Sequence, residues 1–183
     1  MTAAEYLAWE REQPAKHEFH LGEVFAMAGG SPRHHVLAGA MIIELGGALR
    51  GRGCRVMTSD QRVSASDGGR YVYPDAVVVC GGLRVEEGAK DVLANPTVIV
   101  EVLSRATEAY DRGEKWEAYQ RLSSLTDYLL VSQAAVRIEH YRREADGSWR
   151  YREHGAGSRL TLKNGAVIAA DAVYEGAFEV EGD

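Results

Sequence analysis

The stretch TVIVEVL, at residues 97–103, places one carboxylate among six apolar or β-branched neighbours. Such a run is typical of a β-strand that is buried on both faces. Because side chains alternate between the faces of a strand, Glu101 should share one face with Ile99 and Leu103. An ionised carboxylate costs several kcal/mol to bury unless a cation or strong hydrogen bonds compensate it. Glu101 is therefore either half of a buried ion pair with Arg or Lys, or part of a functional site, and we favour the second.

A second apolar run, AVVVC, follows Asp75 and ends at Cys80. The sequence predicts one strand over residues 71–80, in which Pro74 marks the start or an irregularity because proline cannot donate a ladder hydrogen bond. Taken alone, Asp75 could equally be a residue that caps a turn. Two acids isolated in apolar strands, however, are expected to converge across neighbouring strands. Paired carboxylates of this kind suit a hard cation such as Mg²⁺.

A helix is expected from Thr107 to about Leu122, directly after the Glu101 strand. Asp111 and Lys115 lie four residues apart in it, so they share one helical face. The plain interpretation of this spacing is a solvated surface pair. The position of the helix favours another, because its first turns can pack beside the end of the strand and bring the Lys115 ammonium near the carboxylates. There the ammonium could stabilise charge on a phosphate under attack or help to orient the attacking water. Asp111 would hold the ammonium in place.

The rest of the chain alternates helical and β-compatible segments. Helices are predicted at residues 2–12 and from Ser31 to about Arg50, a hairpin at 17–27, strands at 54–59, 61–66, 127–133 and 136–144, and shorter strands and turns from 145 onward. The broad apolar surface of the second helix predicts that it is covered on most sides. The strand, helix, strand order at 97–133 implies one right-handed parallel crossover, while the hairpins imply antiparallel parts. The fold class is α/β, a mixed β-sheet flanked by helices, in one domain over residues 1–183.

The composition of the chain limits the classes of partner and the cellular location that can be expected. The 183 residues include 21 Lys and Arg against 27 Asp and Glu, so the formal charge is −6 and any phosphate-binding patch must be local. No apolar run approaches the ~18–20 residues that a membrane-spanning helix needs, and the start has no apolar signal core, so a cytosolic protein without membrane contact is expected. Cys54 and Cys80 have no metal-ligand spacing and are expected to be reduced, half-buried thiols.

Six stretches within roughly residues 3–135 carry a further pattern: YLAWERE, HEFHLGEVFAMAGGSPRHH, YVYPDAVVV, TVIVEVLSRAT, DRGEKWEAYQRL and TDYLLV. In order and spacing they resemble the Uma2 family, also called DUF820, whose members have a restriction-endonuclease-like fold. The resemblance implies the PD-(D/E)XK nuclease core, in which an Asp and a Glu on adjacent strands bind Mg²⁺, or Mn²⁺ in its place, and a Lys assists hydrolysis of a phosphodiester bond.

The resemblance also implies roles for individual residues. Asp75 matches the Asp of the PD pair and Glu101 the (D/E), with the Val102 carbonyl as an extra metal ligand. Leu103 stands where the nuclease motif has its Lys. Lys115 therefore resembles a lysine that has migrated to the helix, as the family's D-x3-K-x3-Y pattern suggests. Three accessory residues match the family's acidic hairpin and its S-x-x-H position: Glu18, Glu23 and His34.

Two functions of different classes follow. The favoured one is a Mg²⁺-dependent or Mn²⁺-dependent endonuclease acting on DNA, with Asp75 and Glu101 as metal ligands, Lys115 as charge stabiliser and a metal-bound water as nucleophile. The alternative is a non-catalytic binding or assembly module that retains the nuclease fold. A homodimer is expected. Calorimetry with both metals separates the two functions, because a protein that binds neither metal, and in which Asp75→Asn changes only stability, is the module.

Overall fold

The computed structural model describes residues 1–66 and 69–183, and its larger sheet has six strands in the order β11-β10-β9-β8-β6-β3. Strands β8 and β9 are parallel and the other neighbours are antiparallel. The bounds are β3 Cys54–Thr58, β6 Ala76–Cys80, β8 Val98–Val102, β9 Asp127–Val131, β10 Arg137–Arg143 and β11 Trp149–Gly155. The predicted mixed sheet with one parallel crossover is confirmed.

A smaller sheet has five strands in the order β2-β1-β5-β4-β7. They are β1 His17–His20, β2 Glu23–Ala26, β4 Arg62–Ser66, β5 Arg70–Val72 and β7 Val92–Leu93. The predicted hairpin is β1 and β2, and its turn uses positive φ at Leu21 (48°) and Gly22 (99°). The single strand predicted over residues 71–80 is wrong. It is two strands, β5 in the small sheet and β6 in the large one, because the chain breaks around Pro74. Asp75 therefore lies where the chain passes from one sheet to the other.

Both predicted N-terminal helices form. Helix α1 (Ala3–Glu10) begins at a capping box in which Thr2 and Glu5 exchange hydrogen bonds, and α2 (Pro32–Ala48) begins at the N-cap Ser31. Helix α2 buries only one stripe of side chains, and Ile43 on its outer side is 72% exposed. The expectation that α2 is covered on most sides is therefore wrong, because its apolar residues extend around the helix beyond the face that the sheet covers.

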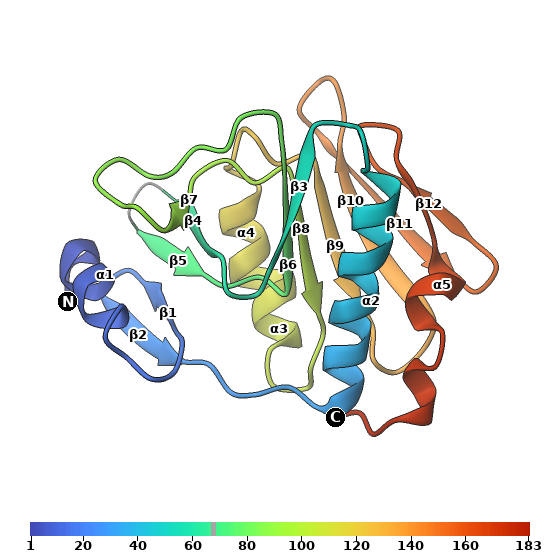
Figure 1. Cartoon of the computed structure of the whole chain (residues 1–183), viewed down its shortest axis with the longest axis horizontal. Helices are drawn as coiled ribbons and strands as arrows, with labels where there is room; N and C mark the ends of the chain where they lie inside the picture. The colour runs from blue at the N-terminus through green and yellow to red at the C-terminus, as the bar shows by residue number, and fades with distance from the viewer. Residues whose placement is uncertain (67–68) are drawn as a thin grey trace.

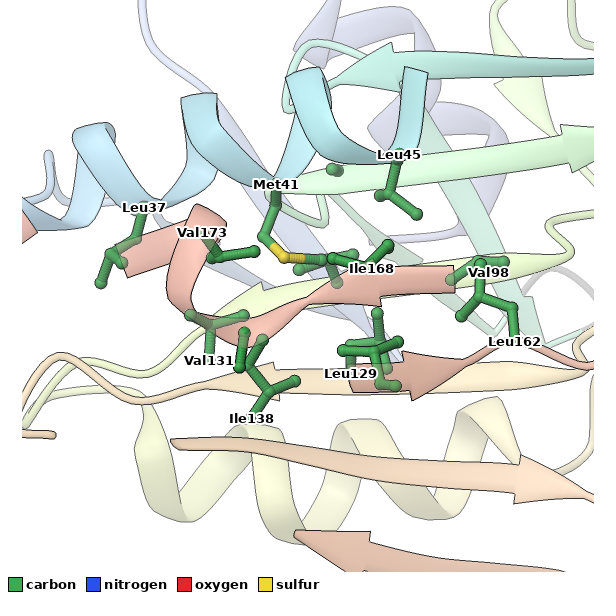
Figure 2. Close-up of a cluster of buried hydrophobic side chains, with 14 of the residues drawn as sticks. Leu37, Met41, Leu45, Val98, Leu129, Val131, Ile138, Leu162, Ile168 and Val173 are labelled. Atoms are coloured by element: carbon green, nitrogen blue, oxygen red, sulfur yellow. The ribbon is translucent and has the colours of Figure 1, made fainter. Parts of the chain in front are cut away.

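Two apolar layers cover the two faces of the large sheet. On one face, Leu37, Met41 and Leu45 of α2 pack over Val98, Leu129 and their neighbours (Figure 2). The same layer includes residues of β12 (Arg159–Thr161), β13 (Val167–Ala169), α5 (Ala170–Tyr174) and η2 (Ala177–Glu179). The segment after residue 145 thus holds a long strand and two short helices besides the shorter strands that were predicted. On the other face, which α3 and α4 cover (Figure 1), the buried cluster includes Ile99 and Leu103 together with Ala118 and Tyr119 of the crossover helix. The predicted shared face of Ile99 and Leu103 is therefore confirmed.

The crossover helix is not the regular helix predicted from Thr107 to Leu122. It consists of α3 (Glu108–Tyr110), the π-helical turn η1 (Asp111–Lys115) and α4 (Trp116–Tyr119). Asp111 and Lys115, the two ends of the π-helical turn, are both buried. Wide turns of this type are rare and occur frequently at functional sites. No helix in the described part of the chain is both long and apolar enough to cross a membrane.

Cys54 and Cys80 form a disulfide between β3 and β6. The expectation of two reduced thiols is therefore wrong. The two residues are direct partners in the antiparallel register of these strands, with Cα atoms 4.0 Å apart. Spacing along the sequence cannot reveal such a pair, because the register of two strands depends on how the sheet assembles.

Replacing both cysteines by serine is expected to lower the free energy of unfolding by about 2–4 kcal/mol, because the crosslink restricts the unfolded chain. Urea unfolding of the oxidised protein and of the Cys54→Ser, Cys80→Ser double variant measures the difference, with the reduced wild type as control. Equal stability of the oxidised protein and the variant would show that the disulfide does not form in solution.

Candidate active site

One buried ammonium joins three carboxylates. Lys115 Nζ lies 3.1 Å from Glu18 Oε1, 3.1 Å from Glu101 Oε1 and 3.3 Å from Asp111 Oδ1. The four side chains are 6%, 8%, 5% and 1% exposed, respectively. They come from η1, β1 and β8, which are far apart in the sequence. We call Glu18, Glu101, Asp111 and Lys115 the carboxylate cluster.

The π-helical turn places Asp111 and Lys115 against β8 and β9. The Tyr128 hydroxyl donates a hydrogen bond of 3.0 Å to the Asp111 carbonyl, and the Trp116 ring stacks on Tyr128 with centroids 5.4 Å apart. These contacts anchor the turn just before and just after the lysine. As predicted, the helix brings Lys115 to the strand that carries Glu101. The same contact is also the buried ion pair that was the alternative interpretation of Glu101.

Tyr119 is a further member of the site. Its hydroxyl donates a hydrogen bond of 2.9 Å to Glu101 Oε1, the same oxygen that Lys115 contacts, and its side chain is fully buried. No functional role was predicted for Tyr119 from the sequence. The signal was the D-x3-K-x3-Y spacing itself, because Asp111, Lys115 and Tyr119 recur every four residues and so lie along one side of the helix.

Asp75 lies at the end of β8, next to Glu101 in the sheet. Its Oδ2 accepts a hydrogen bond of 2.7 Å from the Val102 N–H, and its Oδ1 lies 2.9 Å from His34 Nε2. His34 comes from the first turn of α2. Because the N–H and C=O of one strand residue point to the same edge, the Val102 carbonyl faces the side on which Asp75 lies. The structure thus brings Asp75, Glu101, Val102 and His34 together.

The two glutamates of the hairpin have different positions. Glu18 accepts a hydrogen bond of 3.2 Å from the Tyr73 N–H in addition to its contact with Lys115. Glu23 is exposed on β2, in register with His20, and no contact joins it to the carboxylate cluster within the described residues. The structure therefore supports Glu18 as an accessory residue and does not place Glu23 in the site.

The carboxylate cluster has an excess of negative charge. Burial raises the pKa of Glu101 well above its usual value; Lys115 opposes this shift, while Asp111, Asp75 and Glu18 add to it. Burial also raises the pKa of Asp111. For Lys115, burial would lower the pKa, but its carboxylate neighbours raise it well above the usual value. The ammonium therefore stays charged, and a proton or a second cation must balance the remaining carboxylates.

The donor set suits a hard divalent cation. Apart from the ion pair of 3.3 Å between Asp111 Oδ1 and Lys115, the two carboxylate oxygens of Asp111 are buried without a hydrogen-bond partner. Each oxygen of Asp75 accepts one hydrogen bond and retains a second lone pair. Carboxylate and carbonyl oxygens are the ligands that Mg²⁺ and Mn²⁺ prefer. Among the described residues, no group of three or more His, Cys, Asp or Glu is arranged to hold a metal, so the Val102 carbonyl and water would have to complete a set based on Asp75 and Glu101.

Glu101→Gln is expected to leave the melting temperature of the metal-free protein unchanged or to raise it at neutral pH. The raised pKa of Glu101 means that its stabilising contribution is complete below the ordinary carboxyl pKa and is lost as the pH rises toward the folded value. Glutamine avoids this loss and keeps an acceptor oxygen for Lys115 and Tyr119. Thermal unfolding at about pH 4 and about pH 7.5 measures the difference, which should grow with pH.

Glu117→Gln is the matched control, because it makes the same chemical change at an exposed position of the same helical segment. It should change the melting temperature little at either pH. A loss of several degrees for Glu101→Gln at neutral pH would instead identify Glu101 as a structural ion-pair partner.

Comparison with known proteins gives a family and a fold. The model of the Uma2 family, described as "Putative restriction endonuclease", matches residues 3–172. The "Uncharacterized protein slr1290" of Synechocystis sp. is 37% identical over 177 residues, which cover 96% of this chain and 92% of that protein. A second Synechocystis protein, sll1609, is 32% identical over 149 residues, 81% of this chain and 84% of the relative.

The fold recurs in a crystal structure of a protein from Anabaena variabilis described as "a putative nuclease belonging to DUF820". The TM-score is 0.78 and the match covers 97% of this chain and 99% of that one, at 13% sequence identity. At this identity the likeness concerns the fold alone. The predicted restriction-endonuclease-like fold is confirmed.

Proposed function

Because this chain belongs to the Uma2 family, we propose that it is a divalent-metal-dependent endonuclease that hydrolyses phosphodiester bonds of DNA. The observation that carries the proposal is the place of the carboxylate cluster. A buried ammonium held by three carboxylates lies at the end of β8, directly beside Asp75 at the start of β6. The charge excess of this group and its oxygen ligands support a cation, and the family supports the reaction class.

The residues have separate roles in this proposal. Asp75, Glu101 and the Val102 carbonyl would hold Mg²⁺ or Mn²⁺, which when bound polarises a phosphoryl oxygen and lowers the pKa of a water molecule. Lys115 supplies a fixed positive charge for the phosphate, and Asp111 and Glu18 keep it protonated. Tyr119 fixes the rotamer of Glu101, and His34 fixes that of Asp75.

Cleavage of supercoiled plasmid DNA tests the proposal. We expect nicked and linear products with Mg²⁺ or Mn²⁺, no cleavage with EDTA, and none for Asp75→Asn under the same conditions. Cleavage that persists in EDTA, or equal cleavage by Asp75→Asn, would exclude the proposed site and point to a contaminating nuclease or to another centre. No cleavage of plasmid or of single-stranded DNA with either metal would contradict the proposed activity.

One observation favours the alternative, a non-catalytic binding or assembly module. The side chains of the carboxylate cluster are nearly closed to solvent and satisfy much of their charge among themselves. A network of this kind can have a purely structural role, in which it stabilises the fold and takes no part in catalysis. Calorimetry decides between the two, since the module would bind neither Mg²⁺ nor Mn²⁺.

The homodimer and the cytosolic location are predictions that further experiments can test. The homodimer is tested by sedimentation equilibrium of the purified chain. The cytosolic location is tested by fractionation of cells that express the protein, and the Cys54–Cys80 disulfide argues against it because stable disulfides are rare in the cytosol.

A further inference from the structure

A basic pocket lies at the edge of the large sheet where β10, β11 and β12 meet. Its cavity has a volume of about 60 Å³ and is lined by Thr161 and six basic residues. We call it the arginine pocket, and its basic residues are His140, Arg142, Arg150, Arg152, His154 and Arg159. This concentration is unexpected in a chain with a formal charge of −6. Figure 1 shows the three strands close together, at the opposite end of the molecule from the small sheet.

The arginine pocket is distant from the carboxylate cluster. Arg142 is opposite Asp127, and Asp127 is in register with Val98 at the start of β8, whereas Asp75 binds Val102 at its end. Four residues of strand span about 13 Å. The pocket also lies on the other face of the sheet, because His140 and Arg142 follow Ile138 at intervals of two residues and so share its face, which packs against the α2 layer. The two sites are therefore independent.

Positive charge in the arginine pocket is only partly compensated. Arg142 and Arg150 are direct cross-strand partners, an arrangement of like charges that destabilises a sheet. They share one carboxylate, Glu144, at 3.4 Å and 2.9 Å. Arg152 and Arg159 form no ion pair within the described chain. Among the described residues, the four guanidinium groups thus form ion pairs with one carboxylate, Glu144, while Asp127 contacts His140 at 2.8 Å. The remaining positive charge points to an anion that the pocket receives from solution.

A buried polar atom in the same pocket has no partner. The Nε2 atom of His154 is buried without a hydrogen bond among the described residues. Burial lowers the pKa of His154, and the neighbouring charges of His140 and Arg152 lower it further. Leaving a buried polar atom unpaired destabilises a fold, so native proteins usually satisfy such atoms with a ligand or an ordered water.

We infer that the arginine pocket binds a phosphate-class oxyanion, either free inorganic phosphate or the phosphate group of a small phosphomonoester. The volume of about 60 Å³ corresponds to a few water molecules and so accommodates one tetrahedral oxyanion. Guanidinium groups match the oxygens of a phosphate in pairs, and several of them around one site favour a multiply charged anion over a carboxylate. The inference does not depend on the proposed nuclease activity.

Titration calorimetry with inorganic phosphate at constant ionic strength tests the site. The variant is Arg152→Gln, Arg159→Gln, which removes the two exposed guanidinium groups that have no ion pair among the described residues. Arg121→Gln is the matched control on an exposed surface elsewhere. Wild type and control should bind phosphate alike, and the double variant should bind on the order of 10- to 100-fold more weakly. Without phosphate, the double variant should melt at the same temperature as the wild type or higher, because like charges are removed.

Two further arms identify the source of the anion. Tighter binding of a nucleoside 5′-monophosphate than of inorganic phosphate would assign the site to a small phosphomonoester, and the reverse order to free phosphate; both support the inference. Equal phosphate binding by the double variant and the wild type would overturn it, as would no binding by the wild type at roughly 10 mM phosphate. Duplex DNA that displaces phosphate and loses affinity in the double variant would also overturn it, because the pocket would then be a nucleic-acid surface.

Discussion

Lys115→Met is expected to lower turnover on DNA by about 10²–10³-fold and to lower the free energy of unfolding by about 3–5 kcal/mol at neutral pH. The ammonium is the shared partner of Glu18, Glu101 and Asp111, so its removal leaves three buried carboxylates without a cation. It also removes the fixed positive charge that the proposed mechanism places at the phosphate.

The pH dependence of this loss has a definite sign. The pKa of Lys115 is raised in the folded protein, so its contribution to stability is complete below its ordinary pKa and is lost only as the pH rises through the folded value. At neutral pH the full contribution is therefore present. At lower pH the buried carboxylates become protonated, which removes the uncompensated negative charge in Lys115→Met. The difference in unfolding free energy between wild type and variant should therefore narrow toward about pH 4. Urea unfolding across this range measures it.

Lys115→Arg separates stability from catalysis. Arginine keeps the charge, so most of the stability should return, but the planar guanidinium is larger than the ammonium and should recover only part of the turnover. Equal turnover of Lys115→Met and wild type, with activity still abolished by Asp75→Asn, would show that Lys115 has a structural role only.

Asp75→Asn is expected to abolish binding of Mn²⁺ and to lower cleavage on the order of 10³-fold or more, since a bound cation contributes several kcal/mol to transition-state stabilisation. The fold should persist, because asparagine retains an oxygen for the Val102 N–H. Calorimetry with Mn²⁺ and plasmid cleavage measure the two effects. Asp60→Asn, a change at an exposed aspartate, is the matched control.

The same variant has a readout that does not require activity. Burial would lower the pKa of His34, but the hydrogen bond and charge of Asp75 raise it above the usual value. In Asp75→Asn the burial remains and the charge is gone, so the pKa of His34 should fall. Titration of the His34 ring by NMR checks this in the metal-free protein. An unchanged His34 pKa would contradict the Asp75–His34 contact.

The parts of the site that were predictable from sequence depend on local periodicity. The common face of Ile99, Glu101 and Leu103 follows from strand geometry, and the common side of Asp111 and Lys115 follows from helical spacing. The N-cap Ser31, and with it the start of the helix that carries His34, could be predicted from local chemistry. The family resemblance added the pairing of Asp75 with Glu101 across two strands. The family match also extends beyond the predicted limit near residue 135, to residue 172.

The features that were predicted wrongly, or not predicted at all, depend on contacts between segments that are distant in the sequence. The break at Pro74 separates two sheets, and the disulfide depends on the register of β3 against β6. Glu18 and Glu23 are equally acidic, but only the pairing of β1 with β5 turns one of them toward Lys115. The π-helical turn at residues 111–115 has no pattern in the sequence that we recognised.

Anomalous diffraction from a crystal soaked in Mn²⁺ is the most direct test of the proposed metal site. We expect a strong peak beside the carboxylates of Asp75 and Glu101 at the end of β8, and no peak there in crystals of Asp75→Asn. A soaked wild-type crystal with no peak at these carboxylates, or with an equal peak in the Asp75→Asn crystal, would contradict a metal-dependent centre at this place.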